Sequence, residues 1–265
     1  MHTGNPTLAV HVRRAVVGHV TSRYYANRRG TVSEDPDSKT MNSAEEQRLQ
    51  TQWQELLTSD RCPDPSLKDA WWVRLRDHYS ESARHYHTLQ HIDSMFRLFE
   101  GHRGKLTDLA AVGWAIFFHD IIYNPKASDN EDKSAELFQT FARDCLEDAD
   151  GSTVQRVTEL ILLTKMHSTE AHQVPNMYGH GDEHFFLDFD MQVLGWPDAD
   201  YDRYAQQIRQ EYIHVPEGQY RTARAQVLKE FLKTPNIFAT KEFRDPYEER
   251  ARANIEREIQ RLEGS

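Results

Sequence analysis

The stretch Thr107–Asp120, TDLAAVGWAIFFHD, is apolar on nearly every side and therefore predicts a central, buried helix. Segments with helical periodicity lie on both sides of it, and no sustained alternation of period two is present. The other predicted helices begin at Ser43 and cover Ser66–Tyr79, His85–Phe99, Glu131–Leu146, Thr153–Lys165, Asp200–His214, Glu217–Leu232 and Pro246–Leu262, with a loop at His172–Glu183. We expect an all-α fold, with one helical domain over residues 44–265.

Composition narrows the class of protein. Of the 265 residues, 38% are hydrophobic and 28% charged, and the apolar run Leu109–Phe118 is too short to cross a bilayer. The net charge of −10 argues against a protein that binds a nucleic acid polymer. The two cysteines, Cys62 and Cys145, suggest reduced thiols rather than a disulfide framework. We expect a cytoplasmic protein with no membrane partner.

Residues 1–43 differ from the rest and are treated as an N-terminal extension. Val10–Tyr25 carries several arginines and could form a short amphipathic helix, and no acidic residue precedes Glu34. Thr31–Ser43 has the composition of a linker. Two interpretations stay open: a flexible tail, or a mitochondrial transit peptide within residues 1–30.

The central helix ends in a His-Asp pair, His119 and Asp120, directly after Phe117 and Phe118. Burying an imidazole and a carboxylate beside aromatic rings is costly unless a partner compensates, and a divalent cation would do so. The alternative is a pair at the helix end that faces solvent.

Two further segments place metal-capable side chains in apolar surroundings. His87 and His91 are four residues apart and would share one face of a helix, so that one ligates a metal while the other orients a ligand or contacts substrate. Asp188 and Asp190 alternate inside the run FFLDFDM, where a carboxylate needs a metal or a histidine as partner. The alternatives are a polar surface stripe for the histidines, and a helix cap with a surface acid for the aspartates.

The order His, then His-Asp, then a late Asp resembles the signature of the HD superfamily. The similarity extends to one branch, described as predicted metal-dependent HD phosphohydrolases, and covers roughly residues 50–262. The stretches that carry it are RHYHTLQHI (84–92), FFHDIIY (117–123), DNEDKSA (129–135), LDFD (187–190) with Leu194-Gly195, and RQEY (209–212) with Val215-Pro216.

The resemblance implies an HD-type helical bundle with a metal site between core helices, and a ligand set for it. His91, His119, Asp120 and Asp190 would hold a divalent cation, with Asp188 as the reserve choice for the late aspartate. Such mixed nitrogen and oxygen ligands suit Mn²⁺, Mg²⁺, Fe²⁺, Co²⁺, Ni²⁺ or Zn²⁺, and the sequence does not choose among them.

The implied activity is phosphohydrolysis of a small phosphorylated molecule, with a nucleotide as one option, by a metal-activated water. The residues expected to take part in catalysis are Glu131, Asp120, His87 and His167. Glu131 would take the proton of the attacking water, although it could equally be an acid that stabilises the first turn of a helix. His87 or His167 would protonate the leaving group or hold phosphate.

Other readings and partners remain open at this stage. Arg84, Lys133 and Lys165 are cations near the motifs that could bind phosphate. A di-iron oxygenase of the HD type would need further ligands, which His167 could supply together with one of the loop histidines His172, His180 and His184. A non-catalytic regulator that binds a metal or nucleotide is the second rival. A homo-oligomer is left open.

Overall fold

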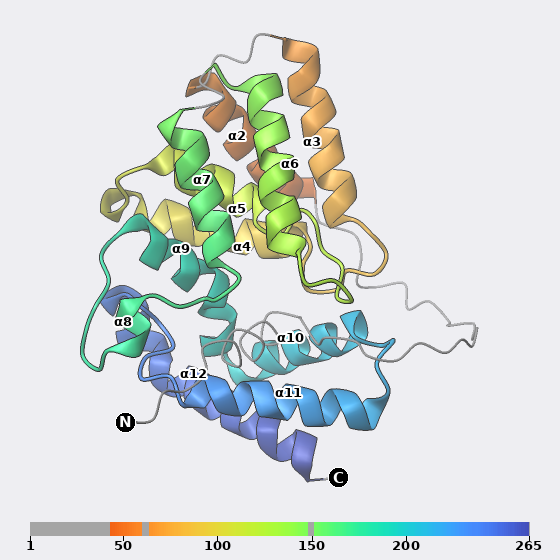
Figure 1. Ribbon diagram of the computed structural model, residues 1–265, viewed down its shortest axis with the longest axis vertical. Coiled ribbons are helices and arrows are strands. Elements are labelled where there is room, and N and C mark those ends of the chain that lie inside the picture. Colours follow the sequence, from red (N-terminus) through yellow and green to blue (C-terminus); the bar gives the residue numbers. More distant parts are fainter. Residues whose placement is uncertain (1–42, 60–63, 148–150, 265) are drawn as a thin grey trace.

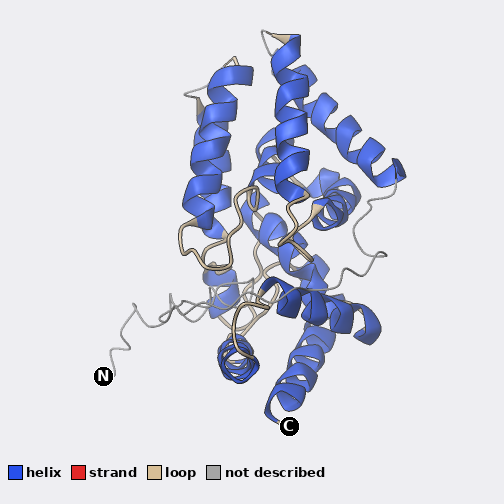
Figure 2. Ribbon diagram, turned by 90° about the vertical axis from the view of Figure 1, so that its right-hand side faces the viewer, coloured by secondary structure: helices blue, strands red, loops and turns tan. Residues whose placement is uncertain are grey.

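The computed structural model describes residues 43–59, 64–147 and 151–264, and in these ranges all regular structure is helical (Figure 2), which confirms the all-α prediction. The helices are α2 (Ser43–Ser59), α3 (Pro65–Tyr79), α4 (Leu89–His102), α5 (Leu109–Phe118), α6 (Asn130–Cys145), α7 (Ser152–Leu163), α8 (Glu170–Gln173), α9 (Asp182–Met191), α10 (Asp198–Glu211), α11 (Glu217–Leu232) and α12 (Lys241–Glu263). Two 3₁₀ turns, η1 (Arg103–Lys105) and η2 (Gln192–Gly195), follow α4 and α9.

Helix α5 is the centre of the molecule, as its sequence predicts. The Asp108 side chain accepts a hydrogen bond from the Ala111 amide and so caps the first turn. Every residue from Ala111 to Phe118 is buried. Trp53 of α2 packs edge-on against Trp114 of α5, with ring centroids 5.2 Å apart. This aromatic packing fixes the end of α5, where His119 and Asp120 follow.

The helices are arranged as a bundle with a second layer below it (Figure 1). The upper bundle surrounds α5 with α2, α3, α6 and α7. The lower group consists of α10, α11 and α12, which lie together. Helix α9 lies between the two groups and contacts both α4 and α5. Helices α4, α5 and α9 thus meet at the centre of the molecule, between the two groups.

Several helix boundaries differ from the prediction. Helix α4 begins at Leu89 rather than His85, because Thr88 caps it by accepting a hydrogen bond from the Gln90 amide. Helix α12 begins at Lys241 and contains Pro246, which was predicted to start it. The predicted loop His172–Glu183 overlaps helices at both ends, because α8 extends to Gln173 and α9 begins at Asp182.

Several sequence features lie outside the described residues, among them the Val10–Tyr25 helix, most of the Thr31–Ser43 linker and Cys62. Cys145 is a buried free thiol. None of the helices in the described ranges is long and apolar enough to span a bilayer.

Candidate metal centre

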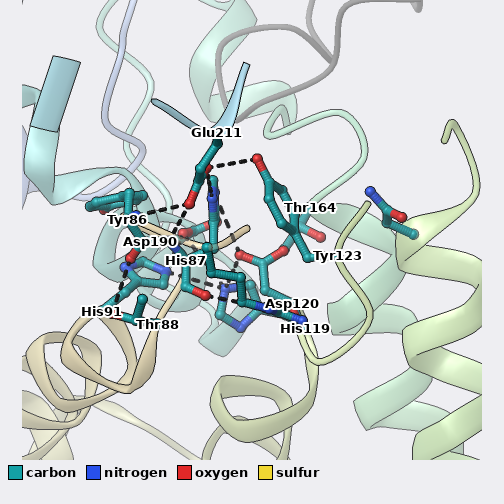
Figure 3. A network of polar contacts seen from close by, with 12 residues as sticks. Tyr86, His87, Thr88, His91, His119, Asp120, Tyr123, Thr164, Asp190 and Glu211 are labelled. Atoms are coloured by element: carbon teal, nitrogen blue, oxygen red, sulfur yellow. Dashed lines mark hydrogen bonds and ion pairs between the residues drawn. The ribbon is translucent and has the colours of Figure 1, made fainter. Parts of the chain in front are cut away.

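Four side chains from three helices converge on one buried point (Figure 3): His91 from the first turn of α4, His119 and Asp120 from the end of α5, and Asp190 from α9. The Nε2 atoms of His91 and His119 are 3.3 Å apart. Asp190 Oδ1 lies 3.1 Å from His91 Nε2, and Asp120 Oδ2 lies 3.2 Å from His119 Nε2. Donor atoms of His91, His119 and Asp120 all lie within 4.8 Å of one another, so this buried group could hold a metal ion.

The backbone around the His-Asp pair is fixed by Arg84. Its guanidinium donates to the carbonyl oxygens of His87, Asp120 and Ile121, at 3.2, 2.7 and 2.7 Å. Arg84 is only 2% exposed. It therefore joins the turn after α5 to the segment before α4, and its donors are used within the protein rather than offered to a phosphate.

A second hydrogen bond fixes the orientation of the His119 ring. The Nδ1 atom of His119 lies 3.0 Å from the carbonyl oxygen of Ile116, which can only accept, so Nδ1 carries a proton. In the neutral ring the lone pair is then on Nε2, which faces the other three side chains. Metal-ligating histidines commonly have this arrangement.

The ionisable groups of the cluster shift one another's pKa values. Burial disfavours charge, yet the imidazoles of His119 and His87 hold the pKa of the Asp120 carboxyl below its usual range. Hydrogen-bonded histidines likewise lower the pKa of Asp190 despite its burial. The carboxylates in turn raise the pKa of His119 to about 9, against the effect of burial. A cation in this place would compete with the His119 proton, so its binding should release a proton.

The residues present fit a divalent cation. Asp120 Oδ2 is buried and accepts no hydrogen bond among the described residues, a condition that is costly unless another group compensates it. Two imidazole nitrogens and two carboxylates form a donor set suited to first-row metals. The four predicted ligands are thus brought together, and their role as ligands stays a prediction.

His167 lies behind Asp190 rather than among the four donors. It follows α7 with a positive φ of 42°, an uncommon conformation for a residue with a side chain. Its Nε2 is 2.6 Å from Asp190 Oδ2. The His167 ring therefore orients the Asp190 carboxylate, whose other oxygen faces His91. Metal ligands are commonly held in this way by a hydrogen-bonded neighbour that does not itself bind the metal.

Replacing His167 with asparagine is expected to weaken metal binding by about 10- to 100-fold, because Asp190 loses the group that orients it. Asparagine tolerates a positive φ, so the backbone should be retained. The dissociation constant for Mn²⁺, measured by titration calorimetry, checks this. His184→Asn is the matched control, because His184 caps α9 by accepting from the Gly181 amide. An unchanged affinity in His167→Asn would contradict the supporting role.

His87 does not lie in α4, so the predicted helical face shared with His91 is wrong. It precedes the Thr88 cap, and the ring centroids of His87 and His91 are nonetheless 6.2 Å apart. His87 Nε2 is buried, has no hydrogen-bond partner within the described ranges, and lies 3.9 Å from Asp120 Oδ2. The chain thus delivers the second histidine to the site from a loop instead of a helix.

Glu211, at the end of α10, is a member of the site that sequence reasoning missed. It is 3% exposed, and its carboxylate receives His87 Nδ1 at 2.7 Å and the Tyr123 hydroxyl at 2.8 Å. A signal was available, because the buried residues of α10 recur at helical spacing and Glu211 is the single acid among them: Tyr201, Tyr204, Ile208 and Glu211. A charge on an apolar stripe needs a buried partner.

Glu131 lies in the first turn of α6 and is buried. That turn is attached to the segment after Asp120, because the Asn130 side chain bonds both the amide and the carbonyl of Asn124. Glu131 is thus a buried acid of the first turn, next to the residue that attaches this turn to the segment after Asp120, and its catalytic role stays a prediction. Nearby, Lys133 pairs with Asp129 at an exposed position and Lys165 pairs with Asp132.

The structure separates the two aspartates of α9. Asp188 accepts hydrogen bonds from the amides of Ala239 and Thr240, both at 2.8 Å, and from the Thr240 hydroxyl at 2.6 Å. It therefore holds the start of α12, whereas Asp190 faces the histidines. The preference for Asp190 agrees with this geometry.

Substituting asparagine at the two positions is expected to give opposite results. Asp188→Asn should lower the free energy of unfolding by about 2 kcal/mol, because the amide group opposes donors that the carboxylate accepted, and should keep the metal. Asp190→Asn should lose the metal. Urea unfolding and elemental analysis of both variants check this. Metal loss in Asp188→Asn alone would reverse the assignment.

The loop histidines are placed elsewhere. His172 Nδ1 accepts from the Thr169 amide at the start of α8, and His184 Nδ1 accepts from the Gly181 amide at the start of α9. His180 is exposed. These rings serve as helix caps or face solvent.

Comparison of the chain with models of known protein families, with curated proteins and with solved structures finds no match. The chemistry of the residues in the site is therefore what supports a functional proposal.

Proposed function

We propose that the protein is a metal-dependent phosphohydrolase of the HD type that acts on a small phosphorylated molecule, with nucleotides among the candidates. The observation that supports this most is a pair of buried atoms facing each other, Asp120 Oδ2 and His87 Nε2, which lie 3.9 Å apart beside the His91 and His119 rings and have no hydrogen-bond partner among the described residues. One atom belongs to a candidate metal ligand and the other to a group that can exchange a proton.

The expected holders of the cation are His91, His119, Asp120 and Asp190. A divalent cation bound there would lower the pKa of a water and stabilise negative charge on a phosphoryl oxygen. The pKa of His87 is raised above its usual value, because Glu211 and Asp120 outweigh the effect of burial. His87 can therefore carry the proton that a leaving group needs.

The residues divide the proton transfers between them. Glu131 takes the proton of the attacking water, and His87 gives a proton from Nε2 to the oxygen that leaves phosphorus. His167 keeps Asp190 in place. Because the four holders of the cation are each at most 8% exposed, we expect only the phosphoryl end of a substrate to reach them.

The rival activities receive less support. An oxygenase with two irons requires further ligands, and one ring nitrogen of each of His167, His172 and His184 already bonds to a protein group. A regulator that only binds metal would have no use for the unsatisfied Nε2 of His87.

A substrate screen tests the proposal. The full-length protein is incubated with phosphomonoesters and nucleotides in the presence of Mn²⁺, Mg²⁺, Co²⁺, Ni²⁺, Fe²⁺ or Zn²⁺, and released phosphate is measured. We expect release from at least one class of substrate that depends on the added metal. Oxygen consumption with Fe²⁺ and no phosphate release would favour the oxygenase, and metal binding without turnover would favour the regulator.

A further inference from the structure

Both oxygens of the Glu211 carboxylate accept hydrogen bonds from the segment His85–His87, and one of them also accepts from the Tyr123 hydroxyl. Its Oε1 accepts three backbone hydrogen bonds, from the amides of His85, Tyr86 and His87 at 2.8, 2.8 and 3.1 Å. Its Oε2 accepts from His87 Nδ1 at 2.7 Å and from the Tyr123 hydroxyl at 2.8 Å (Figure 3). Because these backbone amides bond to Glu211, the segment His85–His87 does not join helix α4, and the position of the His87 ring is fixed.

The His87 ring is also held by its neighbours. The Tyr123 ring stacks on it, with centroids 4.2 Å apart and an interplanar angle of 28°, and Tyr86 packs edge-on at 5.0 Å. With Nδ1 bonded to Glu211, only Nε2 remains for another group. The 3.9 Å between Nε2 and Asp120 Oδ2 is too long for a hydrogen bond, but one oxygen atom can lie within hydrogen-bond distance of both.

We infer that Glu211 is the positioning residue of this site: it keeps a proton on Nδ1 of His87, so that Nε2 is the atom that exchanges a proton with an oxygen of the substrate beside Asp120. This inference rests on the proposed function for its chemistry. Glu211 itself touches no substrate, because both of its oxygens are occupied by protein donors.

Bonds, protons and electron pairs are all accounted for when His87 acts in the proposed reaction. The oxygen of water bonds to phosphorus, while the bond between phosphorus and the leaving oxygen breaks and its electron pair stays on that oxygen. The leaving oxygen takes the Nε2 proton of cationic His87, and Glu131 takes the proton lost by water. The neutral His87 that remains has its proton on Nδ1, bonded to Glu211.

Glu211→Gln changes this proton placement with almost no change of shape. The three backbone amides need an oxygen at the Oε1 position, so the amide nitrogen must occupy the Oε2 position. That nitrogen donates to His87 Nδ1, which can then carry no proton. The single proton of the neutral ring moves to Nε2, and giving it away would leave an imidazolate.

The first readout does not depend on turnover. The full-length protein, labelled with ¹⁵N in histidine and loaded with diamagnetic Zn²⁺, is studied by NMR at mildly alkaline pH, and the His87 ring is assigned from the signals lost in His87→Gln. We expect Nδ1 of His87 to be protonated in the native protein and unprotonated in Glu211→Gln. An unprotonated Nδ1 in the native protein overturns the inference without any variant.

The second readout is kinetic. We expect kcat of Glu211→Gln to fall by about 100-fold or more, as for loss of a general acid, with KM changed by less than about 3-fold. The matched control is Glu258→Gln, since Glu258 is also a buried carboxylate, but its partners are Arg224, at 2.9 Å, and the Tyr201 hydroxyl rather than His87 or Tyr123. It should reduce stability but leave kcat and the His87 signals unchanged.

The outcomes separate the two proposals. Absence of phosphate release in the native protein refutes the proposed function, whereas the NMR result still decides whether Glu211 fixes the His87 proton. Phosphate release that is unaffected in a folded Glu211→Gln overturns the positioning role while the proposed function stands. A fall in kcat with an unchanged His87 proton also overturns it.

Discussion

Asp120→Ala should abolish binding of the proposed cation and reduce the proposed phosphate release to background. The substitution removes one of four donors and half of the carboxylate charge that would attract the metal. Because a metal supplies several kcal/mol of stabilisation to a phosphoryl transition state, we expect kcat/KM to fall by about 1000-fold or more. Elemental analysis of the purified variant and kinetics on the best substrate of the screen measure both effects.

The control for this substitution is Asp93→Ala. Asp93 is also a buried carboxylate, on the same helix as His91, but it pairs with Arg48 at 2.8 Å and with Arg97 at 2.8 Å. Its removal should leave metal content and kcat/KM unchanged. If Asp120→Ala kept both its metal and its activity, the proposed centre would be wrong.

Glu211→Ala should lower the free energy of unfolding by about 3–5 kcal/mol, the largest stability effect we predict. It leaves three backbone amides, the Nδ1 proton of His87 and the Tyr123 hydroxyl without their acceptor in a buried place. Glu211→Gln keeps the three backbone bonds and should cost about 1–2 kcal/mol. Urea unfolding at neutral pH compares the two variants with the native protein.

Glu211 should also make the free energy of unfolding depend on pH. Although burial disfavours its charge, His87 and the backbone amides lower the pKa of Glu211 from the usual 4.5 to about 2. A lowered pKa contributes stability that is present above pH 4.5 and is lost as the pH falls towards 2. The advantage of about 1–2 kcal/mol that the native protein has over Glu211→Gln at neutral pH should therefore be lost in that range. An advantage that does not depend on pH would contradict the charged state of Glu211.

Two parts of the structure could be predicted from local sequence. Periodicity gave the all-α class, and the end of an apolar helix marked His119 and Asp120, because both features depend on residues close together in the chain. The burial of charged groups among aromatic rings is a local signal as well.

Other parts depend on contacts between distant residues. The start of α4 was misplaced because the amides before Thr88 bond to Glu211, more than 120 positions later. The sequence favours Asp190 only through the resemblance, because the partner that Asp188 bonds to, Thr240, lies far along the chain. Arg84 looked available for phosphate until its carbonyl partners were known.

The most direct test of the metal centre is an anomalous difference map from a crystal of the full-length protein grown with Mn²⁺. We predict a peak bonded to Nε2 of His91, Nε2 of His119 and the carboxylates of Asp120 and Asp190, absent from crystals of Asp190→Asn. A map without a peak among these four side chains, or with one only elsewhere on the chain, would contradict the account.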